Sequence, residues 1–112
     1  MKKFLLLCVL VLSGCSTTSN ELRQTVPAIE GKTNKESIKY IGCVLNYWNE
    51  RNTITPISFQ PYQTGYTAQI TDMARGVVML LDASDNPLGG STFRFYKKRD
   101  MNYYEDAIQK CK

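Results

Sequence analysis

Four cysteines, Cys8, Cys15, Cys43 and Cys111, are the residues of this chain best suited to chemistry. A thiolate can act as a nucleophile or bind a metal, and a thiol can also be acylated or form a disulfide. Zinc binding is poorly supported, because a tetrahedral site needs four ligands and the chain contains no histidine. Without histidine, the chain also lacks the most usual general base and cannot form a cysteine–histidine or serine–histidine pair. Acylation and disulfide formation remain.

Carboxylates are the other groups that could do chemistry, at Asp72, Asp82, Asp85, Asp100, Glu105 and Asp106. Asp82 and Asp85 flank a turn, where aspartate commonly accepts hydrogen bonds from the backbone. The segment PLGG, residues 87–90, lacks the lysine and the spacing of a phosphate-binding loop. We therefore expect no catalytic residue, no metal and no cofactor. An enzyme that uses unassigned carboxylates is the weakest of three functional hypotheses.

The first residues have the layout of an export signal. Lys2 and Lys3 precede an unbroken apolar run over residues 4–12, and the small residues Ser13 and Gly14 follow it. This order is typical of a secretory signal peptide. The apolar run is too short for a good transmembrane helix, which needs roughly 20 residues. We expect the protein to be exported.

The segment Leu12-Ser13-Gly14-Cys15 resembles the lipobox of bacterial lipoproteins. The resemblance implies that residues 1–14 are removed and that Cys15 is acylated on sulfur and nitrogen. Several acyl chains would hold the protein firmly in the membrane, because each methylene buried in lipid contributes about 0.8 kcal/mol to the free energy of binding. Ser16 stands where an aspartate commonly retains such proteins in the inner membrane, which implies the inner leaflet of the outer membrane, facing the periplasm. A Gram-positive host would make that distinction meaningless, and a plain secreted protein with an incidental Cys15 is the alternative.

Cys43 and Cys111 are the two cysteines that remain after cleavage and acylation. Export places them in an oxidising compartment, where a single intramolecular disulfide can form. The bridge would close a long loop and stabilise the fold by about 4 kcal/mol. A small domain needs such help, because it buries a smaller fraction of its surface. Two unpaired buried thiols are the alternative.

Composition divides the mature chain into a tether and one domain. Residues 15–35 are polar, with one weak apolar patch that Pro27 interrupts, so we expect a flexible tether there. The whole chain carries a net charge of +4, and the mature part is closer to neutral because Lys2 and Lys3 leave with the leader. Nucleic acid binding would need a dense basic face and is not expected.

Residues 36–112 have the patterns of a small α+β domain. Ile38, Ile41, Leu45 and Trp48 recur at helical spacing over residues 36–51. Strands are expected at residues 53–60, 65–71, 76–84 and 91–98, and a final helix from Asn102, with Glu105 in a capping box. These patterns predict a two-layer fold in which a helix, a three- or four-stranded antiparallel meander and a second helix follow in order. Both helices lie on one sheet face, joined by Cys43–Cys111.

The domain also resembles, more loosely, a group of short bacterial lipoproteins of unknown role. These have a first helix with cysteine and tryptophan, here CVLNYW, and a terminal cysteine, here within YYEDAIQKC. The similar pattern covers about residues 38 to 111. It supports the pairing of Cys43 with Cys111 and implies no catalytic or ligand-binding residue.

Binding is the function class that the composition favours. We expect one outward face, basic with aromatic content, that could meet anionic headgroups or lipopolysaccharide; its residues are Thr92, Arg94, Tyr96, Lys97 and Lys98. The edge strand near residues 59–62 could pair with a strand of a partner. The alternative is that the tyrosines fill the core and the basic residues are simply solvated.

The first hypothesis is a non-catalytic accessory protein of the envelope, held in the membrane by its lipid, that binds an envelope protein or a cell-wall component. The second is a periplasmic inhibitor or exclusion factor, which inhibits a lytic enzyme or excludes superinfecting phage.

Overall fold

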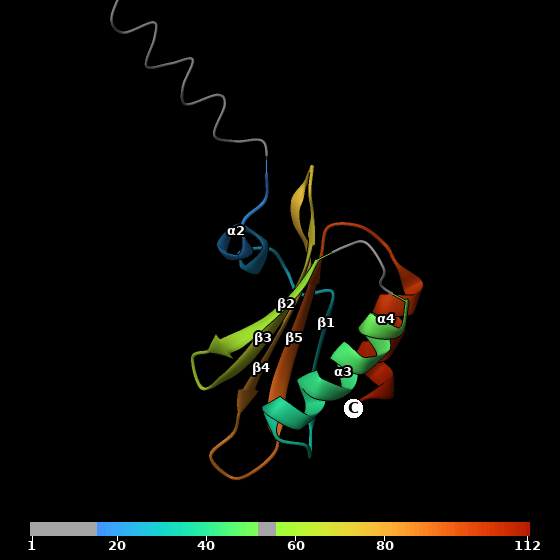
Figure 1. The fold of residues 1–112 in the computed structure, drawn as a ribbon. Coiled ribbons are helices and arrows are strands. Elements are labelled where there is room, and N and C mark those ends of the chain that lie inside the picture. Colours follow the sequence, from blue (N-terminus) through green and yellow to red (C-terminus); the bar gives the residue numbers. More distant parts are fainter. Residues whose placement is uncertain (1–15, 52–55) are drawn as a thin grey trace, which may run out of the picture.

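An antiparallel sheet of five strands forms the centre of the structure, a computed structural model that describes residues 16–51 and 56–112 (Figure 1). In chain order the elements are α2 (Ser19–Arg23), β1 (Ile29–Thr33), α3 (Ser37–Arg51), β2 (Ile57–Tyr62), β3 (Gly65–Asp72), β4 (Gly76–Asp85), β5 (Ser91–Lys97) and α4 (Asn102–Lys110). The strands lie in the order β1-β5-β4-β3-β2. The four-stranded meander is therefore confirmed, and β1 adds a fifth strand beside β5.

The two long helices lie together on one face of the sheet, as the sequence predicts (Figure 1). A disulfide joins Cys43 in α3 to Cys111 at the end of α4, with Cα atoms 5.7 Å apart. The two cysteines are 68 residues apart in the sequence. The bridge therefore closes a loop that contains the whole meander.

Two large aromatic side chains also connect α3 to α4. The indole Nε1 of Trp48 donates a hydrogen bond of 3.0 Å to the carbonyl oxygen of Tyr104. The hydroxyl of Tyr40 donates one of 2.7 Å to the carbonyl oxygen of Ile108. Both side chains are fully buried, so these bonds satisfy polar groups that would otherwise cost folding energy.

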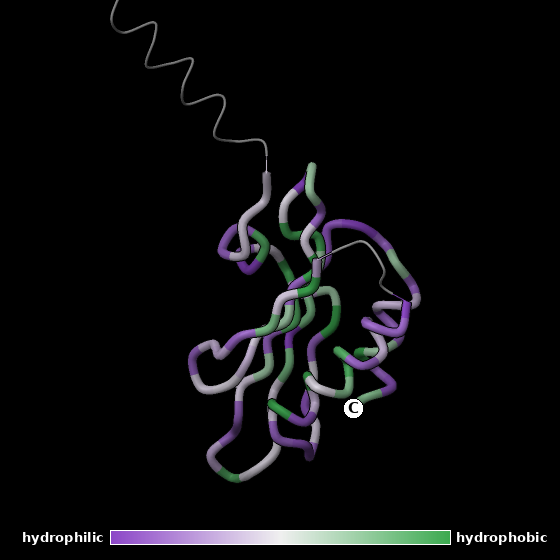
Figure 2. Tube along the Cα trace, in the orientation of Figure 1, coloured by the Kyte–Doolittle hydropathy of each residue, from purple (hydrophilic) through white to green (hydrophobic). Residues whose placement is uncertain are grey.

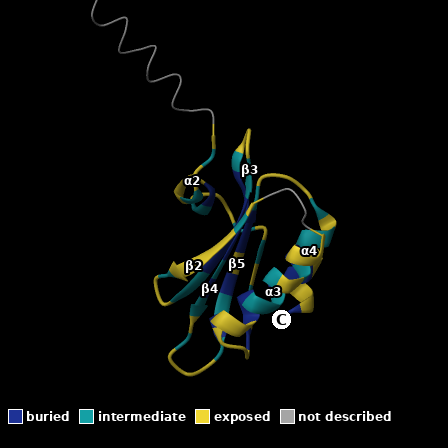
Figure 3. Ribbon diagram, viewed as in Figure 1, coloured by how far each residue is buried: buried dark blue, intermediate teal, exposed yellow. Residues whose placement is uncertain are grey.

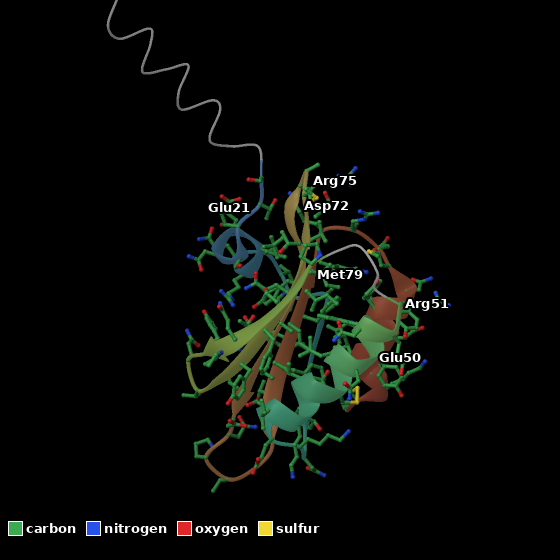
Figure 4. The ribbon with its side chains drawn as sticks, viewed as in Figure 1. Glu21, Glu50, Arg51, Asp72, Arg75 and Met79 are labelled. Atoms are coloured by element: carbon green, nitrogen blue, oxygen red, sulfur yellow. A yellow bond between two sulfur atoms is a disulfide. The ribbon has the colours of Figure 1, made fainter. Side chains whose placement is uncertain are left out.

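The main core lies between these helices and the sheet. Ala68 and Ile70 of β3, and Phe93 and Phe95 of β5, point toward the helices, as the alternation of the sequence predicts. Met79 of β4 is fully buried beside them (Figure 4). Figure 3 shows the consequence, because the central strands are buried while the outer sides of the helices and most of β2 are exposed.

The expectation of a flexible tether over residues 15–35 is wrong for its described part. Residues 29–33 form β1, which pairs with β5 from Ile29 opposite Phe95 to Thr33 opposite Ser91. Gly31 lies against the Phe93 ring, where a Cβ would be 2.9 Å from the nearest ring atom. A short polar segment needs little apolar surface of its own when an existing strand supplies its hydrogen bonds.

The helix α2 lies in the same segment and packs on the other face of the sheet (Figure 1). Its Leu22 is 1% exposed and contacts Val77, Leu80 and Tyr96 in a second, smaller core. The Thr18 side chain accepts a hydrogen bond from the N–H of Glu21 and caps the helix. The fold therefore has helices on both faces of the sheet.

Several predictions concern residues outside the described ranges. They include the leader over residues 1–14, the acylation of Cys15 and the first residues of the strand predicted at 53–60. The described part of that strand is β2, which extends to Tyr62. Within residues 16–51 and 56–112, no helix has the length and apolar character that crossing a membrane requires.

Candidate binding cleft on the open face of the sheet

Among the described residues, α2 is the helix that covers the sheet face opposite α3 and α4, where it contacts β4 and β5. Beyond that helix lies a cleft of about 420 Å³. Its lining comes from α2, the β2–β3 hairpin, β4 and β5, and includes Arg23, Tyr62, Asp82, Ser84, Arg94 and Tyr96. The open face therefore presents a concave surface rich in arginine, tyrosine and hydroxyl groups.

Arg23 forms the wall of the cleft on the side of α2. Its Nε and Nη2 donate to the two carboxylate oxygens of Asp82 over 2.8 and 3.0 Å, and Nη2 also donates to Thr67 Oγ1 over 3.1 Å. The guanidinium carbon lies 3.7 Å from the centre of the Tyr62 ring. Burial lowers the pKa of Arg23, but the hydrogen bond to Asp82 and the charge of that carboxylate act together against it, and the pKa is raised overall. Arg23 is thus a fixed cation between α2, β4 and the hairpin.

The position of Arg23 follows from the way α2 is held. Arg23 is the last residue of this five-residue helix, and Leu22 beside it fixes the helix on the small core. At the other end of the helix, the Ser19 hydroxyl donates a hydrogen bond of 2.8 Å to Gln69 Oε1 of β3. The wall of the cleft is therefore attached to the sheet along its length.

Arg94 and Tyr96 of β5 form the floor of the cleft. Arg94 Nε donates to Glu30 Oε2 of β1 over 2.8 Å, and both side chains are more than half exposed. Tyr96 is only 6% exposed, and burial raises the pKa of its hydroxyl. Arg94 is thus the accessible cation of the floor, while the buried Tyr96 ring forms part of the floor itself.

The structure does not bring the predicted binding residues together on one face. Arg94 and Tyr96 line the cleft with Thr92, but Lys97 belongs to the alternate set of β5 side chains and contacts Asp100 and Glu105 near α4. Its pKa is raised by those two carboxylates. Lys98 lies past the end of β5, where its Nζ contacts the Thr17 hydroxyl. Successive strand side chains point to opposite faces, so Lys97 cannot join Arg94 and Tyr96 in one patch.

Sequence patterns do not indicate three features of the cleft: the place of Arg23, its ion pair with Asp82, and the Tyr62 ring beneath its guanidinium. Arg23 lies in the segment expected to be a tether, and its partner Asp82 is 59 residues away. No local pattern indicates a pair at that separation. The basic and aromatic character of β5 was the only signal that pointed to this face.

Most candidate carboxylates have structural partners. Asp85 accepts hydrogen bonds of 2.7 and 2.9 Å from the N–H and hydroxyl of Ser37, at the first turn of α3. It therefore satisfies the backbone of a distant helix as well as ending β4. Asp72 accepts from the N–H groups of Ala74 and Arg75, and the first of these bonds is the main reason that its pKa is lowered. In the described part of the chain, no three acidic or cysteine side chains are grouped to hold a metal ion.

Comparisons of the chain with models of protein families, with curated proteins and with solved structures found no match. The function is therefore inferred from the residues and their geometry.

Proposed function

We propose that this protein is anchored in the cell envelope through an acylated Cys15, facing the periplasm from the outer membrane, and that its domain binds a protein partner without catalysis. The observation that carries the binding proposal is the open sheet face. An antiparallel sheet commonly packs one face on the core and leaves the other, polar face to solvent. Here the uncovered half is polar and concave, and it is held in shape by α2.

The charges of the cleft favour a polypeptide over a polyanion. Arg23 faces Asp82, and Arg94 faces Glu30, so each cation has a carboxylate within 3.0 Å. A strongly anionic polymer would have to displace those carboxylates. A polypeptide offers both donors and acceptors, which such a balanced surface can bind.

The side-chain types of the cleft also fit a protein interface. Tyrosine and arginine are enriched among the residues that dominate binding energy, and they act best when neighbouring groups hold them rigid. Tyr62 is held beneath Arg23, and Tyr96 lies almost wholly buried beside Leu22. A partner therefore meets an ordered surface and loses little further conformational entropy on binding.

Two substitutions test the cleft without removing a core contact. Ser84→Arg places a long side chain in the cleft, and Arg94→Ala removes its accessible cation. We expect both to abolish capture of the partner by in-cell crosslinking followed by purification of the tagged protein from envelopes. Asn49→Arg adds the same side chain at an exposed site of α3 and should leave capture unchanged.

The outcomes separate the hypotheses. Capture that survives both cleft substitutions would contradict the proposed site. Identification of the captured protein as a lytic enzyme or as a phage entry factor would favour the inhibitor or exclusion hypothesis, and lysozyme and phage sensitivity of the variants would check it.

A further inference from the structure

The turn between β3 and β4 projects from the end of the molecule where the chain enters the fold (Figure 4). We name residues 72–76 the hairpin tip. Asp72 Oδ1 accepts hydrogen bonds of 2.8 and 3.2 Å from the N–H groups of Ala74 and Arg75, which fixes the turn. Met73 is 97% exposed at its apex. Figure 2 shows this hydrophobic apex between hydrophilic neighbours.

The N-terminal segment is fixed directly to the hairpin tip. The N–H of Thr17 donates to the carbonyl oxygen of Arg75 over 3.0 Å, and the N–H of Val77 donates to the carbonyl oxygen of Thr17 over 2.9 Å. Gly76 makes this contact possible, because a Cβ there would lie 2.3 Å from the Thr17 oxygen. Thr17 therefore has a defined place beside the tip.

Only Ser16 separates Thr17 from Cys15. Two residues of extended chain reach at most about 7 Å, so a lipid attached at Cys15 must enter the bilayer close to the hairpin tip. A flexible tether would have allowed the domain to stand away from the membrane. The docked segment leaves no such freedom.

The charges around the tip suit an anionic surface. Arg75 is exposed at the tip, and Lys98 and Arg99 follow the end of β5 beside it. Asp72 is the carboxylate of the tip itself, and its Oδ2 lies 3.6 Å from Arg99 Nη1. Asp100 is exposed and forms an ion pair of 2.8 Å with Lys97. The exposed Glu21 of α2 lies at the same end (Figure 4). The tip with Lys98 and Arg99 thus has more cations than carboxylates, and basic residues beside a membrane attract anionic headgroups.

We infer that the hairpin tip, with Lys98 and Arg99, rests on the bilayer surface that holds the lipid anchor and contacts anionic headgroups there, with Met73 at the interface. The inference rests on the proposed acylation of Cys15. It orients the whole domain, since Ser84 lies about 26 Å along β4 from Gly76. The far part of the cleft, at Ser84 and Thr92, therefore opens away from the membrane, toward a partner in the periplasm.

Two labelled variants of the full-length protein, purified from membranes, test the contact. Met73→Cys carries an environment-sensitive dye at the tip, and Leu88→Cys carries it in the turn at the opposite end, where the leucine is equally exposed. Both proteins are placed in vesicles of phosphatidylcholine with phosphatidylglycerol and a quencher on the lipid headgroup. We expect quenching at position 73 to be severalfold stronger than at position 88. Arg75→Glu should reduce it, whereas Lys39→Glu, at the start of α3, should not.

Flotation of the vesicles separates the possible failures. Protein that does not float lacks the anchor, which would overturn both the proposed anchoring and this inference. Protein that floats, but whose dye at position 73 is quenched no more than at position 88, overturns the membrane contact alone. Quenching at position 73 that is unchanged in vesicles of pure phosphatidylcholine would overturn the preference for anionic lipid.

Discussion

Arg23 and Asp82 form a bidentate ion pair between α2 and β4, with N–O distances of 2.8 and 3.0 Å. The two side chains are 16% and 18% exposed, so water competes little with the bond. The pair attaches a helix of five residues, too short to be stable alone, to the open face of the sheet. It thereby fixes both a wall of the cleft and the segment that precedes β1.

Removal of Arg23 should therefore destabilise the domain more than its surface position suggests. Arg23→Ala leaves Asp82 partly buried without its cation, and we expect a loss of about 2 kcal/mol in the free energy of unfolding. Urea denaturation measures this loss. Arg23→Ala combined with Asp82→Asn should recover part of it, because the unpaired charge is then gone. A single variant as stable as Lys39→Ala would contradict the role of the pair.

The disulfide is expected to be a major source of stability. Replacement of both Cys43 and Cys111 by alanine removes a constraint over 68 residues, which should lower the free energy of unfolding by about 4 kcal/mol. Denaturation with and without reductant provides the check. Reductant should destabilise the native protein and leave the double variant unchanged; a native protein insensitive to reductant, with its thiols shown to be free, would contradict the prediction.

Tyr40 should make the fold sensitive to alkali. Burial raises the pKa of its hydroxyl above the ordinary value of 10.0. The folded state then keeps a proton that the unfolded chain releases, so this contribution to stability is complete below pH 10 and falls as the pH rises further. Tyr40→Phe should flatten the alkaline decline, while at neutral pH the lost bond to Ile108 costs about 1 kcal/mol. Stability curves against pH for Tyr40→Phe and Tyr66→Phe measure the effect, and equal curves would contradict it.

Gly76 should control the docking of the N-terminal segment. Gly76 and Gly89 have φ of +81° and +107°, so alanine is strained at both by about 1 kcal/mol. Only at Gly76 does the added Cβ meet the Thr17 oxygen, whereas nothing lies within 4 Å at Gly89. We expect Gly76→Ala, and not Gly89→Ala, to speed hydrogen exchange at the Val77 amide, which Thr17 protects. Equal exchange in the two variants would mean that Thr17 is not held there.

The meander and the helix pair could be predicted because their signals are local. Ala68 and Ile70, or Phe93 and Phe95, alternate with polar residues, and dense turn residues separate the strands. The buried face of α3 could be predicted only in part, because its apolar residues cover more than one side. Ile38 belongs to the predicted helical spacing of apolar residues but is 41% exposed, whereas Val44 is fully buried.

The α2 helix, β1 and the cleft could not be predicted because their stability comes from distant partners. Arg23 depends on Asp82, and β1 depends on β5, neither of which is visible in a window of neighbouring residues. The start of α4 shows a smaller error, of one residue, which is local. Met101, not Asn102, is the N-cap, and the side chain of Glu105 accepts a hydrogen bond from the Met101 N–H.

The anchoring of the chain at Cys15 is the claim on which the proposed location and orientation depend. Intact mass of the protein from the membrane fraction, with and without a signal peptidase II inhibitor and before and after reduction, tests it most directly. We predict a chain that lacks residues 1–14, carries acyl chains, gains the two hydrogens of a reduced disulfide and is not processed when the inhibitor is present. A chain with an unmodified Cys15, or one that the inhibitor does not affect, would contradict the account.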